Sequence, residues 1–91
     1  MKFIWNWELR PEDIDKVLEK SEKLASEIKK FPEKYPKLSP SYFTGRCKGF
    51  RLIEADNEEQ LMNLLMYFYP EETWNLMLIF ESSKMIERIQ K

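Results

Sequence analysis

Apolar and polar positions alternate along residues 2–9, near the start of the chain. Successive side chains of a strand point to opposite faces, so this alternation predicts a β-strand. One face of that strand carries Phe3, Trp5, Trp7 and Leu9. The other face has Ile4 and Asn6 between charged ends. Such large apolar side chains need a core to cover them, and the mixed second face is typical of a central strand that meets something on both sides.

Residues 11–31 have the spacing of an amphipathic helix. Pro11 suits the first helical turn, and apolar residues then recur at helical spacing, with Ser21 interrupting the stripe. Pro32 ends the helix. The segment 32–41 holds three prolines, which favours a stiff crossover over a lid or docking segment.

A second helix is expected from Asp56 to Tyr69. Asp56 would cap it, with Glu59 three residues on as in a capping box, and Pro70 ends it. Its apolar residues spread beyond one stripe, so we expect it to be covered on more than one side. A short final helix would be capped by Ser82 or Ser83.

Residues 41–55 are interpreted as a β-hairpin with arms 42–47 and 50–55. Lys48-Gly49 would be its two-residue turn, because glycine readily adopts positive φ. This register places Arg46 opposite Arg51. Residues 73–80 form the last expected strand.

The order β-α-β-β-α-β plus a terminal helix predicts one α+β domain over residues 1–91. We expect a ferredoxin-like antiparallel sheet with strand order 4-1-3-2 and both main helices on one face. The first and last strands carry apolar residues on both sides, for example Ile4, Met77 and Ile79 opposite the tryptophans. A monomer would leave these residues in water, so we expect a homodimer whose sheets pack face to face around a cavity.

Two short motifs resemble a family of small proteins of unknown function. Trp7 to Glu12 is similar to that family's W-x-x-x-P-E, and Gly49 to Asp56 resembles its third strand. The resemblance covers most of residues 1–80. Since that family is similar to the dimeric α+β barrel proteins, the resemblance implies a dimeric barrel and assigns no activity.

Composition excludes several kinds of chemistry. The 91-residue chain has no histidine and one cysteine, which argues against catalytic triads, metal sites and cofactor-bearing centres such as haem or iron–sulfur clusters. A formal charge of −1 gives no field for nucleic acid or acidic membranes. The single cysteine and the lack of a signal-peptide pattern favour the cytoplasm. Cys47 lies between two basic residues, which favours thiolate chemistry, but a small apolar strand residue is the preferred interpretation.

The candidate ligand site is a set of polar residues predicted to share one sheet face. It consists of Asn6, Glu8, Thr44, Arg46, Arg51 and Asn75. The two arginines could fork onto a small anionic ligand such as a carboxylate or phosphate.

The absence of a catalytic constellation favours a non-catalytic homodimeric module that binds a small ligand or a partner. The alternative is a cofactor-free enzyme using the barrel cavity. Some dimeric α+β barrel enzymes are cofactor-independent monooxygenases that use asparagine and tryptophan, and Asn6 and Trp74 match them by type.

Overall fold

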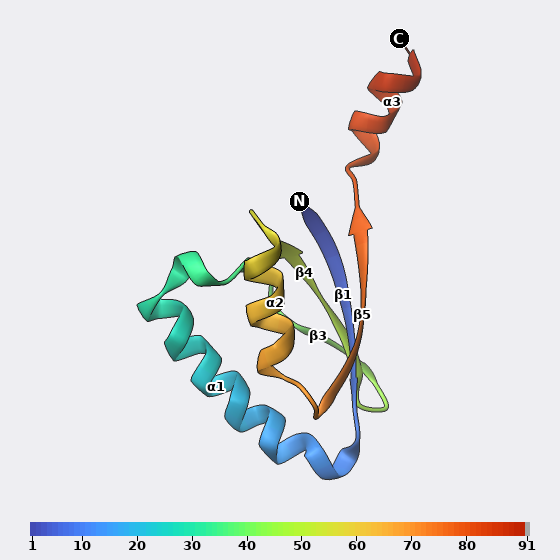
Figure 1. Cartoon of the computed structure of the whole chain (residues 1–91). Coiled ribbons are helices and arrows are strands. Elements are labelled where there is room, and N and C mark those ends of the chain that lie inside the picture. Colours follow the sequence, from blue (N-terminus) through green and yellow to red (C-terminus); the bar gives the residue numbers. More distant parts are fainter. Residues whose placement is uncertain (91) are drawn as a thin grey trace.

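The computed structural model describes residues 1–90 and has one antiparallel sheet covered on one face by helices (Figure 1). Short 3-10 turns at Pro11–Asp13 and Pro32–Lys34 flank the first α-helix. The strands and α-helices are β1 (Lys2–Leu9), α1 (Ile14–Lys30), β2 (Lys37–Leu38), β3 (Tyr42–Gly45), β4 (Lys48–Glu54), α2 (Glu58–Tyr67), β5 (Glu72–Ile79) and α3 (Ser82–Gln90). The expected α+β class with an antiparallel sheet is confirmed.

The strand β1 is central, as its two-sided pattern predicts. It pairs antiparallel with β4 on one side and β5 on the other, so that Trp5 lies opposite Arg51 of β4 and Leu76 of β5. This register fixes which side chains share a face, because opposite residues in a sheet point the same way. The Trp5 face is the one that meets the helices.

The four-stranded order 4-1-3-2 is wrong. The sheet has five strands along the path β2-β4-β1-β5, and β3 also pairs with β4 off this path. The unexpected strand is β2, whose residues Lys37 and Leu38 lie opposite Glu54 and Ile53. It arises within the proline-rich segment 32–41, which the sequence analysis interpreted as a stiff crossover.

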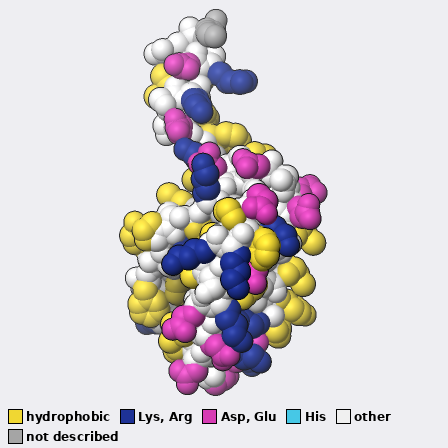
Figure 2. Space-filling view, turned by 90° about the vertical axis from the view of Figure 1, so that its left-hand side faces the viewer, with side chains coloured by type: hydrophobic (Ala, Val, Ile, Leu, Met, Phe, Trp, Pro, Cys, Tyr) yellow, Lys and Arg dark blue, Asp and Glu magenta, His cyan; other side chains and the backbone are white. Residues whose placement is uncertain are grey.

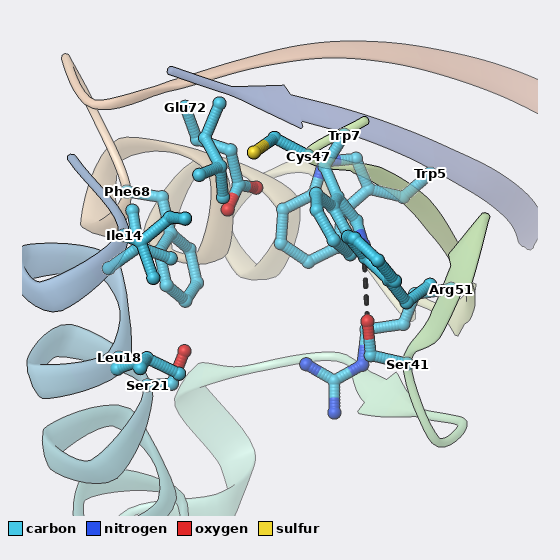
Figure 3. A pocket seen from close by; sticks show the side chains of 13 residues that line it. Trp5, Trp7, Ile14, Leu18, Ser21, Ser41, Cys47, Arg51, Phe68 and Glu72 are labelled. Carbon is cyan, nitrogen blue, oxygen red and sulfur yellow. Dashed lines mark hydrogen bonds between the residues drawn. The ribbon is translucent and has the colours of Figure 1, made fainter. Parts of the chain in front are cut away.

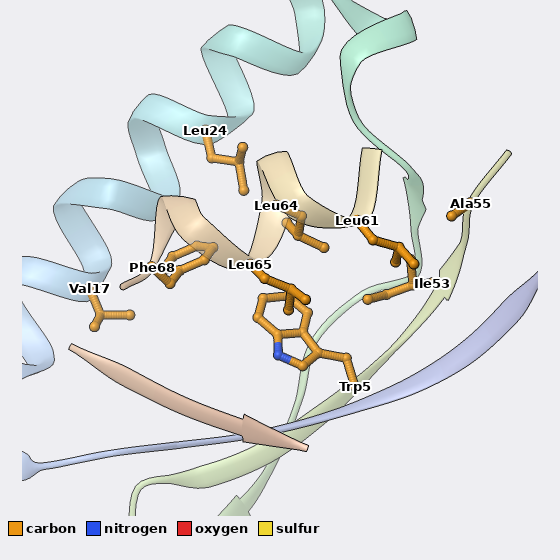
Figure 4. Close-up of a cluster of buried hydrophobic side chains, with 9 residues drawn as sticks. All are labelled: Trp5, Val17, Leu24, Ile53, Ala55, Leu61, Leu64, Leu65 and Phe68. Atoms are coloured by element: carbon orange, nitrogen blue, oxygen red, sulfur yellow. The ribbon is translucent and has the colours of Figure 1, made fainter. Parts of the chain in front are cut away.

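The core lies between the helices and the Trp5 face of the sheet (Figure 4). Trp5 is 2% exposed and packs against the ring of Phe68 at the end of α2, with 5.8 Å between the ring centroids. The buried apolar residues are Trp5, Val17, Leu24, Ile53, Ala55, Leu61, Leu64, Leu65 and Phe68. The helix α2 supplies more of them than α1.

The hairpin register expected from the Lys48-Gly49 turn is wrong. The turn is formed by Arg46 and Cys47, with φ of +55° and +57°, and Lys48 and Gly49 belong to β4. Two successive positive φ values suit the twist of a tight hairpin, but they usually recruit glycine or asparagine. Gly49 is needed for space instead: a Cβ there would overlap the Trp7 ring and the carbonyl of Tyr42.

The helix α2 spans Glu58–Tyr67 and is therefore two residues shorter at each end than the expected 56–69, with its cap one residue later than expected. Its cap is Asn57, whose Oδ1 accepts a hydrogen bond from the N–H of Gln60 at 2.9 Å. Gln60 Oε1 in turn accepts from the N–H of Asp56 at 2.8 Å. The Asp56–Glu59 capping box is therefore wrong: Asn57 caps the helix, and the Gln60 side chain binds the residue before the cap.

The final helix α3 projects away from the rest of the molecule at the end of β5 (Figure 1). Its residues are all exposed, including the apolar Met85, Ile86 and Ile89. On the face shown in Figure 2, acidic, basic and apolar side chains are intermingled. Within residues 1–90, no helix has the length and apolar character needed to cross a membrane.

Candidate functional site

Four of the six predicted ligand residues lie together on the open face of the sheet, which points away from the helices. Asn6 lies opposite Asn75, and both line a depression together with Glu8 and Thr44. Their side chains are exposed. Lys48, which also lines the depression, approaches Glu8 to 3.9 Å between Nζ and Oε1. This depression therefore contains one loose ion pair and amide groups accessible to water.

The two predicted arginines do not lie together. Arg46 is exposed at the hairpin turn, whereas Arg51 lies on the helix side of the sheet beside Trp5. Arg51 Nε donates to the carbonyl of Ser39 at 2.9 Å. Partial burial lowers the pKa of Arg51, and the charge of Glu72 opposes that shift. The paired-arginine anion site expected from the sequence therefore does not form.

A different cavity lies on the helix side, with a volume of about 420 Å³ (Figure 3). This volume is in the range of small-molecule sites, which run from roughly 300 to 1,000 Å³. The cavity lies between the start of α1, the middle of β1, the hairpin and the end of α2. Its apolar walls are Trp5, Trp7, Leu9, Ile14, Val17, Leu18, Phe43 and Phe68. The polar or reactive groups in its lining are Ser21, Ser41, Cys47, Arg51 and Glu72. We call it the helix-side pocket.

The pocket exists because α1 does not fill the space below its first turns. Ser21 interrupts the apolar stripe of α1 where the helix faces the pocket. Leu18, one turn earlier, is 59% exposed and therefore does not close the cavity. A larger apolar residue at position 21 would extend the core into this space.

The opposite wall is held by aromatic side chains. Trp7 stacks on Phe43 of β3, with 6.3 Å between the ring centroids, and its indole Nε1 donates to Ser41 Oγ at 3.1 Å. Close packing of Trp7 over Gly49 fixes the ring against the sheet. The Trp7 ring is therefore held in place from several sides, and Figure 3 shows its hydrogen bond to Ser41.

Glu72 is the unusual group of the pocket. It begins β5 and is only 7% exposed, and its carboxyl oxygens point into the cavity between Phe68 and the tryptophans (Figure 3). Within residues 1–90, neither Glu72 Oε1 nor Trp5 Nε1, which belongs to another lining residue, has a hydrogen-bond partner. Burial raises the pKa of Glu72 from 4.5 to about 7, and the attraction of Arg51 only partly opposes this shift.

The neighbouring Glu71 behaves in the opposite way. It forms ion pairs with Lys16 and Lys20 of α1, and the Lys20 hydrogen bond is the main cause that lowers the pKa of Glu71 to about 2. Lys20 Nζ also donates to the carbonyl of Tyr69 at 3.1 Å. These contacts connect α1 to the segment immediately before β5, next to Glu72.

Sequence reasoning missed Glu72, although a signal was present. The alternation of β5 puts Glu72 on the same face as Trp74, Leu76 and Leu78, opposite Leu9. An acid that continues an apolar face is expected to be buried, and a buried acid needs a partner or an unusual pKa. Starting the strand at residue 73 hid this pattern, because Glu72 was then assigned to the loop.

In comparisons with known proteins, no family model, curated protein or solved structure matches the chain. Among the described residues, no group of three or more His, Cys, Asp or Glu side chains could hold a metal ion. What the site could bind is therefore inferred from its lining residues alone. It offers an apolar cavity, a carboxyl group that changes charge near neutral pH and aromatic faces around it.

Proposed function

We propose that the protein is a non-catalytic, homodimeric module of the cytoplasm that binds a small apolar ligand in the helix-side pocket. One observation carries this proposal: a carboxyl group that is more than nine-tenths buried faces a cavity of ligand size, and its Oε1 has no partner within residues 1–90. Leaving a buried polar group unpaired costs about 1–3 kcal/mol. A ligand with a hydrogen-bond donor would remove that cost.

The test is to block the pocket without disturbing the core. Ser21→Phe places a ring in the cavity, whereas Ser26→Phe puts the same ring on an exposed position of α1 that lines none of the cavities described above. Calorimetric titration with phenylbutanol, an apolar probe with a donor, should show binding to the wild type and to Ser26→Phe. Ser21→Phe should bind at least tenfold more weakly. Equal binding by all three proteins would refute the proposal.

The proposed homodimer interface is the open face of the sheet, which points away from the helices. The apolar residues there are Ile4, Tyr42, Phe50, Leu52, Met77 and Ile79. Met77 at the middle of this patch is 56% exposed, and a strand face with such residues is usually covered by another chain. Two copies packing these faces together would give a dimeric α+β barrel, as the family resemblance implies.

Light scattering should give a dimer at micromolar concentration for the wild type. Met77→Lys should dissociate it, because a lysine would be buried without a partner. Met62→Lys is the matched control, since Met62 is 61% exposed on the outer side of α2. A wild-type monomer, or dissociation only by Met62→Lys, would show that the open face is not the interface.

A cofactor-free enzyme using the same pocket is the second candidate, favoured by the pKa of Glu72 near 7. A carboxylate in an apolar site is a stronger base than one in water. Nitrobenzisoxazole tests this property: the carboxylate takes its ring C–H proton while the N–O bond breaks, giving a cyanophenolate. Turnover that rises with pH through about 7 and is lost in Glu72→Gln would support this candidate. Turnover at the rate of free carboxylates would exclude it.

A further inference from the structure

The helix-side pocket combines two features that recognise the same kind of group. The first is the carboxyl of Glu72, whose Oε1 is an acceptor without a donor within the described residues. The second is its aromatic lining, formed by Trp5, Trp7, Phe43 and Phe68. Figure 3 shows the Glu72 oxygens directed into the space between the Phe68 ring and the tryptophan rings. Ring faces carry partial negative charge and attract cations within about 6 Å.

We propose that the ligand of the helix-side pocket is an apolar amine, bound as its ammonium ion on the carboxylate of Glu72 and against the aromatic rings. This proposal rests on the proposed binding function and names the class of ligand. An ammonium group donates up to three hydrogen bonds, so it would satisfy Glu72 Oε1, and its positive charge would favour the ionised carboxylate.

Among the described residues that line the pocket, Arg51 is the one charged group besides Glu72. On β4, Arg51 faces the same cavity, but its guanidinium lies apart from the Glu72 carboxyl, on the side of Ser41 (Figure 3), and is only partly buried. The hairpin turn contributes Cys47. No acidic or basic residue of α1, β1 or the end of α2 lines the pocket. The lining residues there are Ile14, Val17, Leu18 and Ser21 of α1, Trp5, Trp7 and Leu9 of β1, and Phe68 after α2. Lys16 and Lys20 are paired with Glu71.

An anion would be poorly placed in the same cavity. It would meet the buried carboxyl of Glu72 and the negative faces of the rings, with Arg51 as its one cationic anchor in the lining. The second anchor that an anion site would use, Arg46, lies at the exposed turn. An ammonium ion would instead meet a compensating negative charge at the buried end of the pocket.

Amine binding should depend on pH in a definite direction. The ammonium binds the ionised form of Glu72, and with a pKa of about 7 that form rises from roughly a tenth to nine-tenths of the molecules between pH 6 and pH 8. Affinity should therefore increase about tenfold over this range, with release of a proton from Glu72. A carboxylate ligand would show the opposite trend, because it would favour protonated Glu72.

The experiment compares three probes with the same tail: phenylbutylamine, phenylbutanol and phenylbutanoate, titrated calorimetrically at pH 6 and pH 8 into the wild type, Glu72→Gln, Ser21→Phe and Ser26→Phe. We expect the amine to bind best at pH 8 and to lose its advantage over the alcohol, and its pH dependence, in Glu72→Gln. Ser21→Phe should weaken every probe and Ser26→Phe none.

The outcomes separate this inference from the binding function. Suppose that Ser21→Phe weakens binding of the alcohol or the carboxylate, and that the amine binds the wild type no better than they do. The amine assignment is then overturned, and the pocket remains a binding site. If amine affinity is the same at both pH values, or unchanged in Glu72→Gln, the role of Glu72 is overturned. If no probe binds at millimolar concentration, both the amine assignment and the proposed function fail.

Discussion

The pKa of Glu72 makes a quantitative prediction about stability. In the unfolded chain its carboxyl should titrate near 4.5, and burial raises the pKa to about 7 in the folded protein. Because the folded-state value is the higher one, protonation favours folding. The contribution is fully present below about pH 4.5 and is lost as the pH rises through about 7. The whole shift corresponds to about 3 kcal/mol, of which about 2.5 kcal/mol is lost between pH 5 and pH 8.

Glu72→Gln removes the titration while keeping the shape of the side chain. Urea unfolding followed by far-ultraviolet circular dichroism at pH 5, 6, 7 and 8 should show the wild type losing stability across this range. The variant should lack that loss and should be the more stable protein at pH 8. The chain has no histidine, so no imidazole titration overlaps this range.

The control is Glu22→Gln, which removes an exposed acid on α1 and should leave the pH dependence of the wild type intact. If the free energy of unfolding changes with pH in the same way for the wild type and Glu72→Gln, the carboxyl of Glu72 is not desolvated in solution. That result would remove the electrostatic basis for both the amine site and the acid–base alternative.

Three further predictions concern packing and the junction of α1 with β5. Gly49→Ala should lower the free energy of unfolding in urea by about 2–3 kcal/mol, because a methyl group would displace Trp7. A variant as stable as the wild type would contradict the close approach of Trp7 to Gly49. Trp5→Ala should lower the free energy of unfolding by about 4 kcal/mol, and Trp7→Ala by clearly less because Trp7 is only half-buried. Equal losses of stability in the two variants would show that burial does not determine the cost. Glu71→Gln should lower stability at pH 7, and because the folded pKa is about 2, the difference from wild type should shrink as the pH falls from 4.5 toward 2. A difference that persists at pH 2 would rule out the ion pair as its cause.

Strong periodic patterns predicted the main elements of the fold. The alternation in 2–9 gave β1, the helical stripe in 11–31 gave α1 with a 3-10 turn before it, and the class of the sheet followed. The hairpin turn could not be found this way. Positive φ was assigned to glycine by rule, whereas here tertiary packing places Arg46 and Cys47 in that conformation and uses Gly49 for contact with Trp7.

The candidate site was predictable only in part. Asn6, Glu8, Thr44 and Asn75 do share a face, as strand alternation combined with matching polarity between neighbouring strands predicted. The helix-side pocket required knowledge of how far α1 lies from the sheet, which no local pattern contains. The burial of Glu72 also depended on where β5 begins, and strand ends are the least certain feature of a pattern.

The arrangement of the tryptophans gives the protein an internal optical reporter. Trp5 and Trp7 form walls of the helix-side pocket, whereas Trp74 lies on the edge strand β5, 40% exposed. Trp74→Phe would leave a chain whose indole emission arises only from the pocket walls. Occupancy could then be followed by fluorescence quenching without any attached dye, and the same signal would serve to screen compound collections.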